Sequence, residues 1–314
     1  MTEVVLQTKG LTKRFGALTA VNNLNLEIYR GEIFGFLGPN GAGKTTSINM
    51  MCGLLRPDSG QVFLEGKAIV DGDGGTHRRV GVAPQEIVLW ERLTCLEQLR
   101  FIGAMYGVES RTVEKRAEEL LTILGLAERR HSQARTLSGG MQRRLNLALA
   151  LVHDPHIIVL DEPEAGLDPQ SRLTVREFVR SLARRKTVIL TTHNMDEAER
   201  VADRIAIIDH GELLVLDTPQ AIKRSVGEGD VVEVSLAAMQ GDAAALRAQL
   251  SDLATFRLDD ETKTFTVRAL NAVSALPRIL KALPACGFPV EEVRVRANTL
   301  EDAFIRLTGR RLRE

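Results

Sequence analysis

The stretch Gly38–Thr46 reads GPNGAGKTT, and it directly follows the apolar run Ile33–Leu37, IFGFL. It fits the pattern G-x-x-x-x-G-K-[ST], in which a glycine-rich loop joins a strand to a helix and its backbone N–H groups surround a phosphate. Lys44 is expected to bind the β- and γ-phosphates of a nucleotide, and Thr45 to offer its hydroxyl to Mg²⁺. The candidate nucleotide-binding residues of this loop are Gly38, Pro39, Asn40, Gly41, Ala42, Gly43, Lys44, Thr45 and Thr46.

A phosphate loop of this kind needs an acidic residue on a neighbouring strand to hold the metal. The segment His156–Glu162 supplies one, because four apolar residues are followed by Asp161 and Glu162. Both acids are thus predicted at the carboxyl end of a strand, where ligands bind in open α/β sheets. Consecutive side chains on a strand point in opposite directions, so the two acids have different tasks. Asp161 is the predicted metal partner, through water, and Glu162 is the predicted base that polarises the attacking water.

Short apolar runs alternate with helical patterns over residues 1–220, and this alternation predicts an α/β domain with a parallel sheet. Leucines recur at helical spacing between Ile87 and Gln133, which predicts a helical insertion. The helical subdomain is placed at about residues 87–150. The predicted strands are Val4–Lys9, Leu24–Ile28, Ile33–Leu37, Gly60–Leu64, Val80–Ala83, Ile157–Leu160, Thr187–Thr191 and Arg204–Asp209.

A second, smaller α+β domain is predicted after the linker SVGEGD at residues 225–230. The segments that follow alternate as strand, helix, strand, strand, helix and strand, an order typical of the ferredoxin-like βαββαβ arrangement. A last helix follows, with Asn298 or Thr299 as its N-cap. The two domains are therefore placed at residues 1–224 and 231–314.

The composition excludes several classes of protein. The chain has 314 residues, 44% of them apolar and 26% charged, so it is neither disordered nor collagen-like. Lys plus Arg and Asp plus Glu both number 41, a balance that argues against a general nucleic-acid binder. The longest clean apolar run, Leu147–Val152, is far shorter than the roughly 18–20 residues of a membrane span, so a membrane link requires a partner. Cys52, Cys95 and Cys286 lack CxxC spacing and indicate a reduced, cytosolic protein.

The segment Leu137–Arg143 reads LSGGMQR and opens a helix, and it resembles the signature motif of ATP-binding cassette (ABC) proteins. Other marks of that family occur in its usual order, namely Phe15 in KRFG, Gln85 after GVAP, Gly166-Leu167-Asp168 after the acid pair and His193 after VILTT. The resemblance covers residues 2–220. Within the family, the chain is similar to the ATP-binding subunits of the drug-resistance and sodium-export group. This likeness is carried by PQE at 84–86, RFIGAMYG at 100–107, TTHNMDEAERVADRIAIIDHGEL at 191–213 and the ending LEDAFIRLTGRRLRE.

The resemblance implies that two chains hold two ATP molecules between them, head to tail, with a second copy or a paralogue as the other chain. Ser138, Gly139 and Gly140 then meet the γ-phosphate that the opposite chain binds, because a helix start favours an anion. Asp168 crosses the same interface. The implied cofactors are ATP and Mg²⁺.

Three further roles come with the resemblance. Phe15 stacks on adenine. Gln85 touches the metal or the attacking water and relays the state of the site to the membrane subunit. His193 contacts the γ-phosphate and holds Glu162 in place. The implied catalytic residues are thus Glu162, His193 and Gln85, and the implied metal-binding residues are Thr45, Gln85 and Asp161.

The sequence departs from the family pattern at a few positions. Glu164 and Ala165 stand where the family usually has threonine and a small polar residue, which places an extra carboxylate near the site. Phe15 replaces the commoner tyrosine, so stacking is retained and a hydroxyl contact is lost. Arg143 and Arg144, which follow the signature, are expected on a solvated helix face.

The function predicted from these features is that of an ATPase subunit that drives a membrane exporter. Its partner is expected to be a separate multi-span permease, docked near Gln85–Leu96, which places the chain at the cytoplasmic face of the cell membrane. The alternative is a soluble cassette ATPase that acts in DNA repair or on ribosomes. For the C-terminal domain two roles stay open: a structural extension that braces the dimer, which we favour, and a regulator that binds a small ligand.

Overall fold

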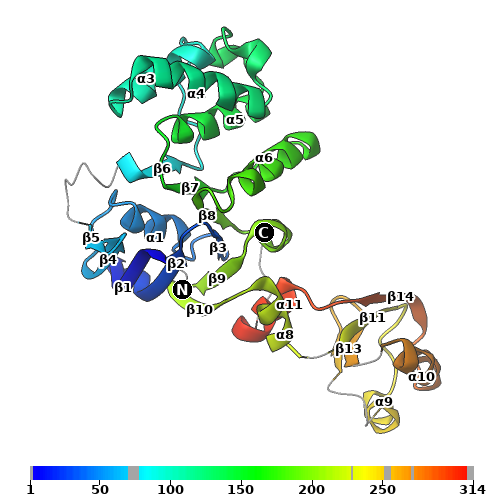
Figure 1. Ribbon diagram of the computed structural model, residues 1–314. Coiled ribbons are helices and arrows are strands. Elements are labelled where there is room, and N and C mark those ends of the chain that lie inside the picture. Colours follow the sequence, from blue (N-terminus) through cyan, green and yellow to red (C-terminus); the bar gives the residue numbers. More distant parts are fainter. Residues whose placement is uncertain (1–2, 70–77, 228, 251–255, 270–271, 310–314) are drawn as a thin grey trace. The chain divides into compact units, whose positions relative to one another are not determined.

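The computed structural model describes residues 3–69, 78–227, 229–250, 256–269 and 272–309, and the chain divides into two compact units (Figure 1). The first unit ends at Pro219 and the second begins at Gln220, a few residues before the expected end of the ATP-binding domain at residue 224. Helix α8 (Pro219–Ser225) lies at this boundary. The carbonyl of Val226, just after α8, accepts a hydrogen bond from Arg306, which explains why this stretch belongs to the second unit.

The central sheet of the first unit has six strands in the order β10-β9-β3-β8-β7-β6. They are β3 (Ile33–Leu37), β6 (Val80–Ala83), β7 (Ile157–Asp161), β8 (Thr187–Thr192), β9 (Arg204–Asp209) and β10 (Glu212–Asp217). All neighbouring pairs from β9 to β6 are parallel, and β10 is an antiparallel edge strand that was not predicted. Every residue of β3, β7 and β8 is buried, as expected for central strands covered on both faces. The predicted α/β class is confirmed.

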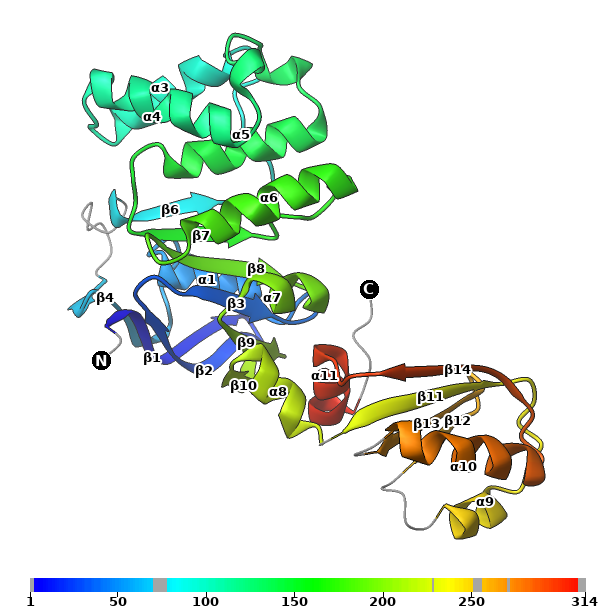
Figure 2. The same ribbon diagram turned by 45° about the vertical axis from the view of Figure 1, so that its right-hand side comes forward.

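A second, antiparallel sheet has the order β2-β1-β4-β5. Its strands are β1 (Val4–Phe15), β2 (Leu18–Tyr29), β4 (Ser59–Leu64) and β5 (Lys67–Ala68). β1 and β2 are longer than predicted because they form one hairpin, which continues through several register shifts to the pair Phe15 and Leu18. Helix α1 (Lys44–Met51) packs in a core that contains Leu24 of this sheet and Phe36 of the central sheet (Figure 2).

The predicted helical insertion consists of α3 (Cys95–Met105), α4 (Ser110–Ile123) and α5 (Gly139–Leu151), with 3-10 turns at Ala127–Arg129 and Ala134–Thr136 (Figure 2). The helical pattern expected from Ile87 onward is wrong for residues 87–94, which form a loop. The first helix begins only at Cys95, because Thr94 and Glu97 form a reciprocal capping box. Two more helices, α6 (Pro169–Leu182) and α7 (Met195–Val201), follow β7 and β8.

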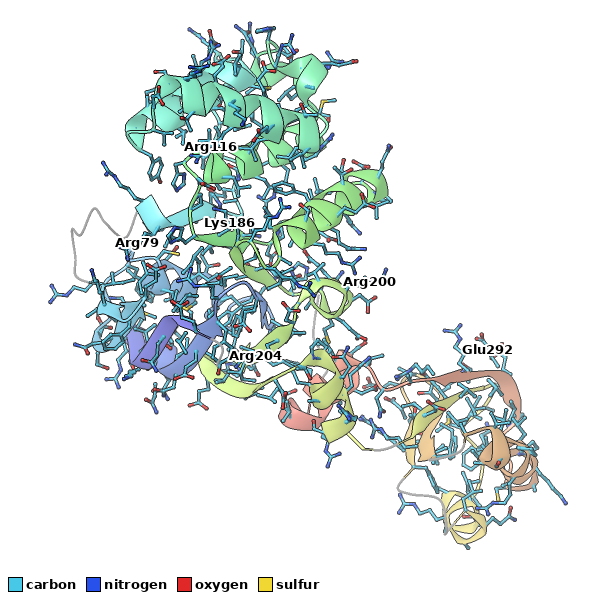
Figure 3. The ribbon with its side chains drawn as sticks, in the orientation of Figure 1. Arg79, Arg116, Lys186, Arg200, Arg204 and Glu292 are labelled. Atoms are coloured by element: carbon cyan, nitrogen blue, oxygen red, sulfur yellow. The ribbon has the colours of Figure 1, made fainter. Side chains whose placement is uncertain are left out.

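Asp154 connects the helical insertion to the central sheet. Its carboxylate accepts hydrogen bonds from Arg116 of α4 at 2.9 Å and from Lys186, directly before β8, at 2.6 Å. Both cations are labelled in Figure 3. The residue has a φ of 60°, which places its carboxylate beyond the end of α5. One carboxylate therefore bridges two cations from segments far apart in the sequence.

The second unit contains β11 (Asp230–Leu236), α9 (Ala243–Gln249), β12 (Arg257–Asp259), β13 (Thr264–Ala269), α10 (Ala272–Ala285), β14 (Val290–Arg296) and α11 (Leu300–Thr308). The strand order is β12-β13-β11-β14, and all neighbouring pairs are antiparallel. Leu246 of α9 and Ile279 of α10 share a core with Val234 and Phe265, so these two helices cover one face of the sheet. Part of the predicted strand Ala254–Leu258 lies outside the described residues. Among the described helices, none has the length and apolarity to cross a bilayer.

Candidate active site

The phosphate loop lies between β3 and α1, and it curves around the side chain of Lys44. The ammonium Nζ donates to the carbonyl oxygens of Gly38 at 2.7 Å and Pro39 at 3.1 Å, and only 6% of the residue is exposed. Burial lowers the pKa of Lys44, and the charges of Glu162 and Asp161 oppose that shift. The side chain is therefore positioned as a buried cation at the start of a helix, where an anion is favoured.

Two glycines of the loop are required by close backbone contacts. A Cβ at Gly43, whose φ is 97°, would collide with the carbonyl oxygen of Ala20, and a Cβ at Gly38 would collide with that of Ile208. The loop can therefore pack this closely against the neighbouring backbone only with glycine at both positions. The rest of the predicted set, Pro39, Asn40, Gly41, Ala42, Thr45 and Thr46, continues the same loop into the first turn of α1.

Asp161 is the last residue of β7, and it faces α1. Its Oδ2 accepts a hydrogen bond from the hydroxyl of Thr45 at 3.2 Å, and its Oδ1 accepts one from the hydroxyl of Thr191 on β8. The two oxygen groups predicted to hold a metal thus lie within hydrogen-bond distance of each other.

Glu162 is the point at which the other catalytic candidates meet. Its Oε1 lies 2.9 Å from Nδ1 of His193 and 4.0 Å from Nζ of Lys44, and its Oε2 accepts a hydrogen bond from Nε2 of Gln85 at 3.5 Å. The backbone of Glu162 has a φ of 49°, an uncommon conformation for a residue other than glycine. Hydrogen bonds from its N–H to Thr191 hold this conformation, and strained backbone of this kind concentrates at functional sites.

The signature residues form a separate cluster. The hydroxyl of Ser138 caps α5 by accepting from the N–H of Met141 at 3.3 Å, so the helix begins at Gly139, two residues before the predicted start at Met141. Asp168 caps α6 in the same way, and its pKa is lowered chiefly by a hydrogen bond from Ser171. Within the described ranges, no hydrogen bond or ion pair joins Ser138, Gly139, Gly140 or Asp168 to Lys44 or Glu162.

Phe15 lies at the end of β1, and 51% of it is exposed. Its ring is contacted by the ammonium of Lys13, 5.7 Å from the ring centroid. An exposed aromatic ring with a free face is suited to stacking on a nucleobase.

Comparison with known proteins places these features in one family. The family model described as ABC transporter matches residues 21–165. The linearmycin resistance ATP-binding protein LnrL of Bacillus subtilis is 36% identical over 99% of this chain and 100% of its own length. The chain belongs to the ABC transporter ATP-binding protein family. The predicted family, ATPase activity and transport role are thereby confirmed.

Further relatives of this ABC protein are named for export and resistance. The Nod factor export ATP-binding protein I of Ralstonia nicotianae is 40% identical over 99% of this chain and 95% of its own length. The daunorubicin resistance ATP-binding protein DrrA3 of Streptomyces coeruleorubidus is 36% identical over 100% of this chain and 99% of its own length. These relatives favour the exporter subunit over an ATPase of DNA repair or ribosomes. The chain is an ATP-hydrolysing subunit of the exporter type.

Solved structures confirm the cassette fold. An ATP-binding subunit of an ABC transporter aligns with a TM-score of 0.65 at 30% identity, over 70% of this chain and 92% of its own. A dimeric ATP-binding cassette in a post-hydrolysis state, bound to ADP and Pi, aligns with a TM-score of 0.62 at 29% identity. The alignment covers 68% of this chain and 98% of that cassette.

Arg143 is a buried centre of this ABC site, and the expectation that it lies on a solvated helix face is wrong. Only 3% of it is exposed. Its guanidinium donates to the carbonyl oxygens of Gln85 at 2.6 Å and Asp161 at 2.7 Å, and also to those of Pro84, Glu162 and Pro163. It therefore ties α5 to the loops that carry Gln85 and Glu162. A cation three residues after the second signature glycine, on the face that packs on the sheet, is the signal that sequence reasoning missed.

Glu164, the departure from the family pattern, is also buried. Its carboxylate accepts two hydrogen bonds from Arg176 of α6, at 3.0 and 2.5 Å. A pocket of about 370 Å³ lies beside this pair and is also lined by Glu162, His193 and Glu197. Burial raises the pKa of Glu197 to about 7, and the charge of Glu164 contributes in the same direction.

Proposed function

We propose that this ABC subunit hydrolyses ATP with Glu162 as general base, in a site that the signature residues of a second chain complete. The observation that carries the proposal is the convergence of His193, Gln85 and Lys44 on the Glu162 carboxylate. The carboxylate is buried beside a pocket, where it can orient and deprotonate a water molecule.

The residues present fit a magnesium ion. Mg²⁺ is commonly held by one or two carboxylates together with substrate phosphates and water. Asp161 and Thr45 would supply one carboxylate and one hydroxyl, and Gln85, whose amide nitrogen donates to Glu162, would add its amide oxygen. The ion, when bound, would neutralise charge on the phosphate oxygens.

The chain's own groups account for binding and for proton handling. The N–H groups of Gly41, Gly43 and Lys44 would face the β-phosphate, while Nζ of Lys44 would exchange its carbonyl contacts for phosphate oxygens. His193 would hold Glu162 through Nδ1 and meet the γ-phosphate through Nε2. Glu162 would take the proton of the attacking water at the oxygen nearest Gln85.

A head-to-tail dimer would bring Ser138, Gly139, Gly140 and Asp168 to the γ-phosphate of the opposite chain. The separation of this cluster from Lys44 and Glu162 supports the proposal, because within the described residues no hydrogen bond or ion pair ties the helix start at Ser138 to the phosphate loop of its own chain. The similar dimeric cassette with ADP and Pi supports it as well. Phe15 would stack on the adenine.

A multi-span permease would dock beside Gln85 and place the subunit at the cytoplasmic face of the membrane. Large apolar side chains lie exposed in and next to the loop that follows Gln85, and Trp90 and Phe101 make an edge-to-face contact with centroids 5.1 Å apart. The set comprises Ile87, Val88, Trp90, Phe101 and Met105. Exposed apolar clusters of this kind mark interaction sites. We assign no nucleic-acid partner.

The C-terminal unit would be an accessory domain of the ferredoxin-like class. Its element order, its strand order β12-β13-β11-β14 and its antiparallel pairing support this assignment. The ATP-binding domain, with its helical subdomain, would account for the first unit.

The decisive experiment is the substitution Glu162→Gln. The variant keeps the shape of the side chain and removes the base, so we expect ATP turnover to fall by roughly 10²–10⁴-fold while ATP binding is retained. Size-exclusion chromatography with Mg²⁺ and ATP should then show an accumulated dimer. Glu177→Gln, on an exposed position of α6, is the matched control. Turnover by Glu162→Gln at the control rate would refute the assignment of the base.

A further inference from the structure

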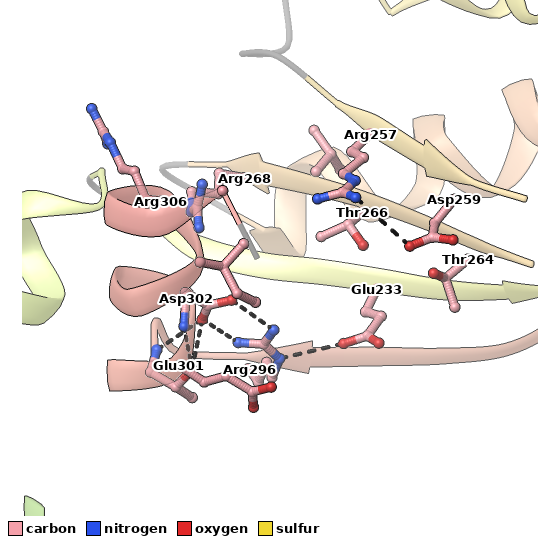
Figure 4. Close-up of a pocket in the computed structure, with 14 residues that line it drawn as sticks. Glu233, Arg257, Asp259, Thr264, Thr266, Arg268, Arg296, Glu301, Asp302 and Arg306 are labelled. Carbon is pink, nitrogen blue, oxygen red and sulfur yellow. Dashed lines mark hydrogen bonds and ion pairs between the residues drawn. The ribbon is translucent and has the colours of Figure 1, made fainter. Parts of the chain in front are cut away.

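The second unit carries a pocket on the face of its sheet that α9 and α10 leave uncovered. Because side chains alternate along a strand, Phe265 faces the two helices while Thr266 and Glu233 face the other way. Helix α11 crosses one end of this open face, where Arg296 donates to Asp302. A cavity of about 630 Å³ lies between the helix and the sheet (Figure 4).

Four arginines line this pocket, and two of them are paired with acids. The terminal nitrogens of Arg296 donate to Asp302 at 2.6 and 3.1 Å, and its Nε donates to Glu233 at 3.4 Å. Arg257 at the rim lies 3.9 Å from Asp259, a looser ion pair (Figure 4). These two arginines contribute little net charge to the cavity.

The other two arginines, Arg268 and Arg306, have neutral partners. Arg268 donates through Nε to the amide oxygen of Asn298 at 3.1 Å, and Arg306 donates through Nη1 to the backbone carbonyl of Val226. In the part of the chain that the structure describes, neither guanidinium forms an ion pair with a carboxylate. Both line the pocket at its α11 end, beside the carboxylate of Glu301, and among the described residues they are its two guanidinium groups without an ion pair (Figure 4).

We propose that this pocket binds a hydroxylated phosphate monoester, with Arg268 and Arg306 on the phosphate. A phosphate monoester carries about −1.5 to −2 charges at neutral pH, which matches two guanidinium groups, and the guanidinium fork suits its oxygen geometry. The cavity lies within the range of about 300–1,000 Å³ that small-molecule sites occupy, so it has room for more than the phosphate. Thr264, Thr266 and Glu233 offer the hydroxyl and carboxylate oxygens that would meet hydroxyl groups of the ligand.

The test uses the full chain saturated with Mg²⁺ and ADP, so that the phosphate loop is occupied, and sn-glycerol 3-phosphate as the probe in isothermal titration calorimetry. We expect one additional site. Arg268→Gln and Arg306→Gln should each weaken binding by roughly tenfold or more, as expected for a lost charged hydrogen bond. Arg268→Lys should recover part of the affinity. Arg294→Gln is the matched control, because that arginine pairs with Glu292 on its own strand and lies outside the pocket.

A second arm separates a soluble ligand from a lipid headgroup. Sedimentation with vesicles that contain phosphatidic acid is compared with vesicles of phosphatidylcholine alone. Arginine-dependent binding to the former without binding of glycerol 3-phosphate assigns the phosphate to a lipid. Thermal unfolding without ligand shows that each variant is folded. The proposal is overturned if neither probe binds, or if the folded glutamine variants bind as tightly as the unmodified chain.

Discussion

The carboxylate of Glu164 and the guanidinium of Arg176 form a two-point ion pair, at 3.0 and 2.5 Å, directly behind the catalytic candidates. Glu164 follows Glu162 by two residues, and Arg176 projects from α6, the helix that Asp168 caps. The pair therefore anchors the segment between the proposed base and the proposed interface residue.

Removal of either partner of this pair should destabilise the protein. Arg176→Gln leaves Glu164 as an uncompensated buried charge and should cost roughly 3–5 kcal/mol of unfolding free energy, measured with urea, whereas Glu164→Gln leaves the partly exposed Arg176 and should cost less. The double variant should lose less than the sum, by about 0.5–3 kcal/mol. Strictly additive losses would show that the two side chains do not interact in solution.

Glu197 should make stability depend on pH. Its pKa is raised from 4.5 to about 7 by burial, so the folded state binds more protons than the unfolded state between these values. The stabilising contribution is therefore full below about pH 4.5 and is lost as the pH rises through about 7, by at most about 3 kcal/mol. Glu197→Gln should abolish this decline, whereas the exposed Glu177→Gln should keep it. If the stability of the two variants fell in the same way with rising pH, Glu197 would not be the group responsible for the decline.

His193 should act on turnover rather than on nucleotide affinity. Its Nδ1 lies 2.9 Å from Glu162, so its loss frees the carboxylate. Its proposed contact with the γ-phosphate is one among those of the phosphate loop, which stays intact. We expect His193→Ala to lower kcat by roughly a hundredfold or more while KM for ATP changes little. His131→Ala, in the helical insertion, serves as the control. A rise in KM with unchanged kcat would assign His193 to binding instead.

Arg143 should be needed both for stability and for turnover. Lysine carries a point charge without the planar fork, so Arg143→Lys reduces the number of donors to the five backbone carbonyls. Those of Pro84 and Glu162 keep a second donor, and those of Gln85, Asp161 and Pro163 depend on the guanidinium most. Each unsatisfied buried carbonyl costs roughly 1–3 kcal/mol. We expect a lower unfolding midpoint and a lower kcat, with no change in the exposed control Arg111→Lys. A variant as stable and active as that control would exclude a structural role.

Phe15 should affect the affinity for ATP, through its contact with the base, and should not affect the rate of turnover. Stacking of a base on an aromatic ring contributes about 1–3 kcal/mol, so Phe15→Ala should weaken ATP binding by roughly tenfold. Turnover at saturating ATP should stay the same, and Phe15→Tyr should bind as the unmodified chain does. An unchanged affinity in Phe15→Ala would place the base elsewhere.

Sequence reasoning recovers the parts of the molecule that local pattern determines. The loop around Lys44 and the strand that ends in Asp161 depend on residues adjacent in the chain, and each is found where it was predicted. The helix after Ser138 is also found, with an earlier start than predicted. The parts it missed depend on tertiary contacts. Burial of Arg143 follows from carbonyl groups on two distant loops, and the edge strand β10 (Glu212–Asp217) is defined by its pairing with β9. The carbonyl groups that Arg143 contacts lie between 18 and 59 residues away in the sequence.

The five hydrogen bonds of Arg143 have a mechanical consequence. The guanidinium donates to the backbone carbonyl of Gln85. The helix that carries Arg143 is capped by Ser138, at the tip that would face the opposite chain. A displacement of the Gln85 loop, whether by the permease or by nucleotide, would therefore be transmitted as a shift of that tip. In the proposed assembly, this one side chain would couple the docking site of the membrane partner to the surface that meets the neighbouring cassette, so closure of one half would depend on events in the other.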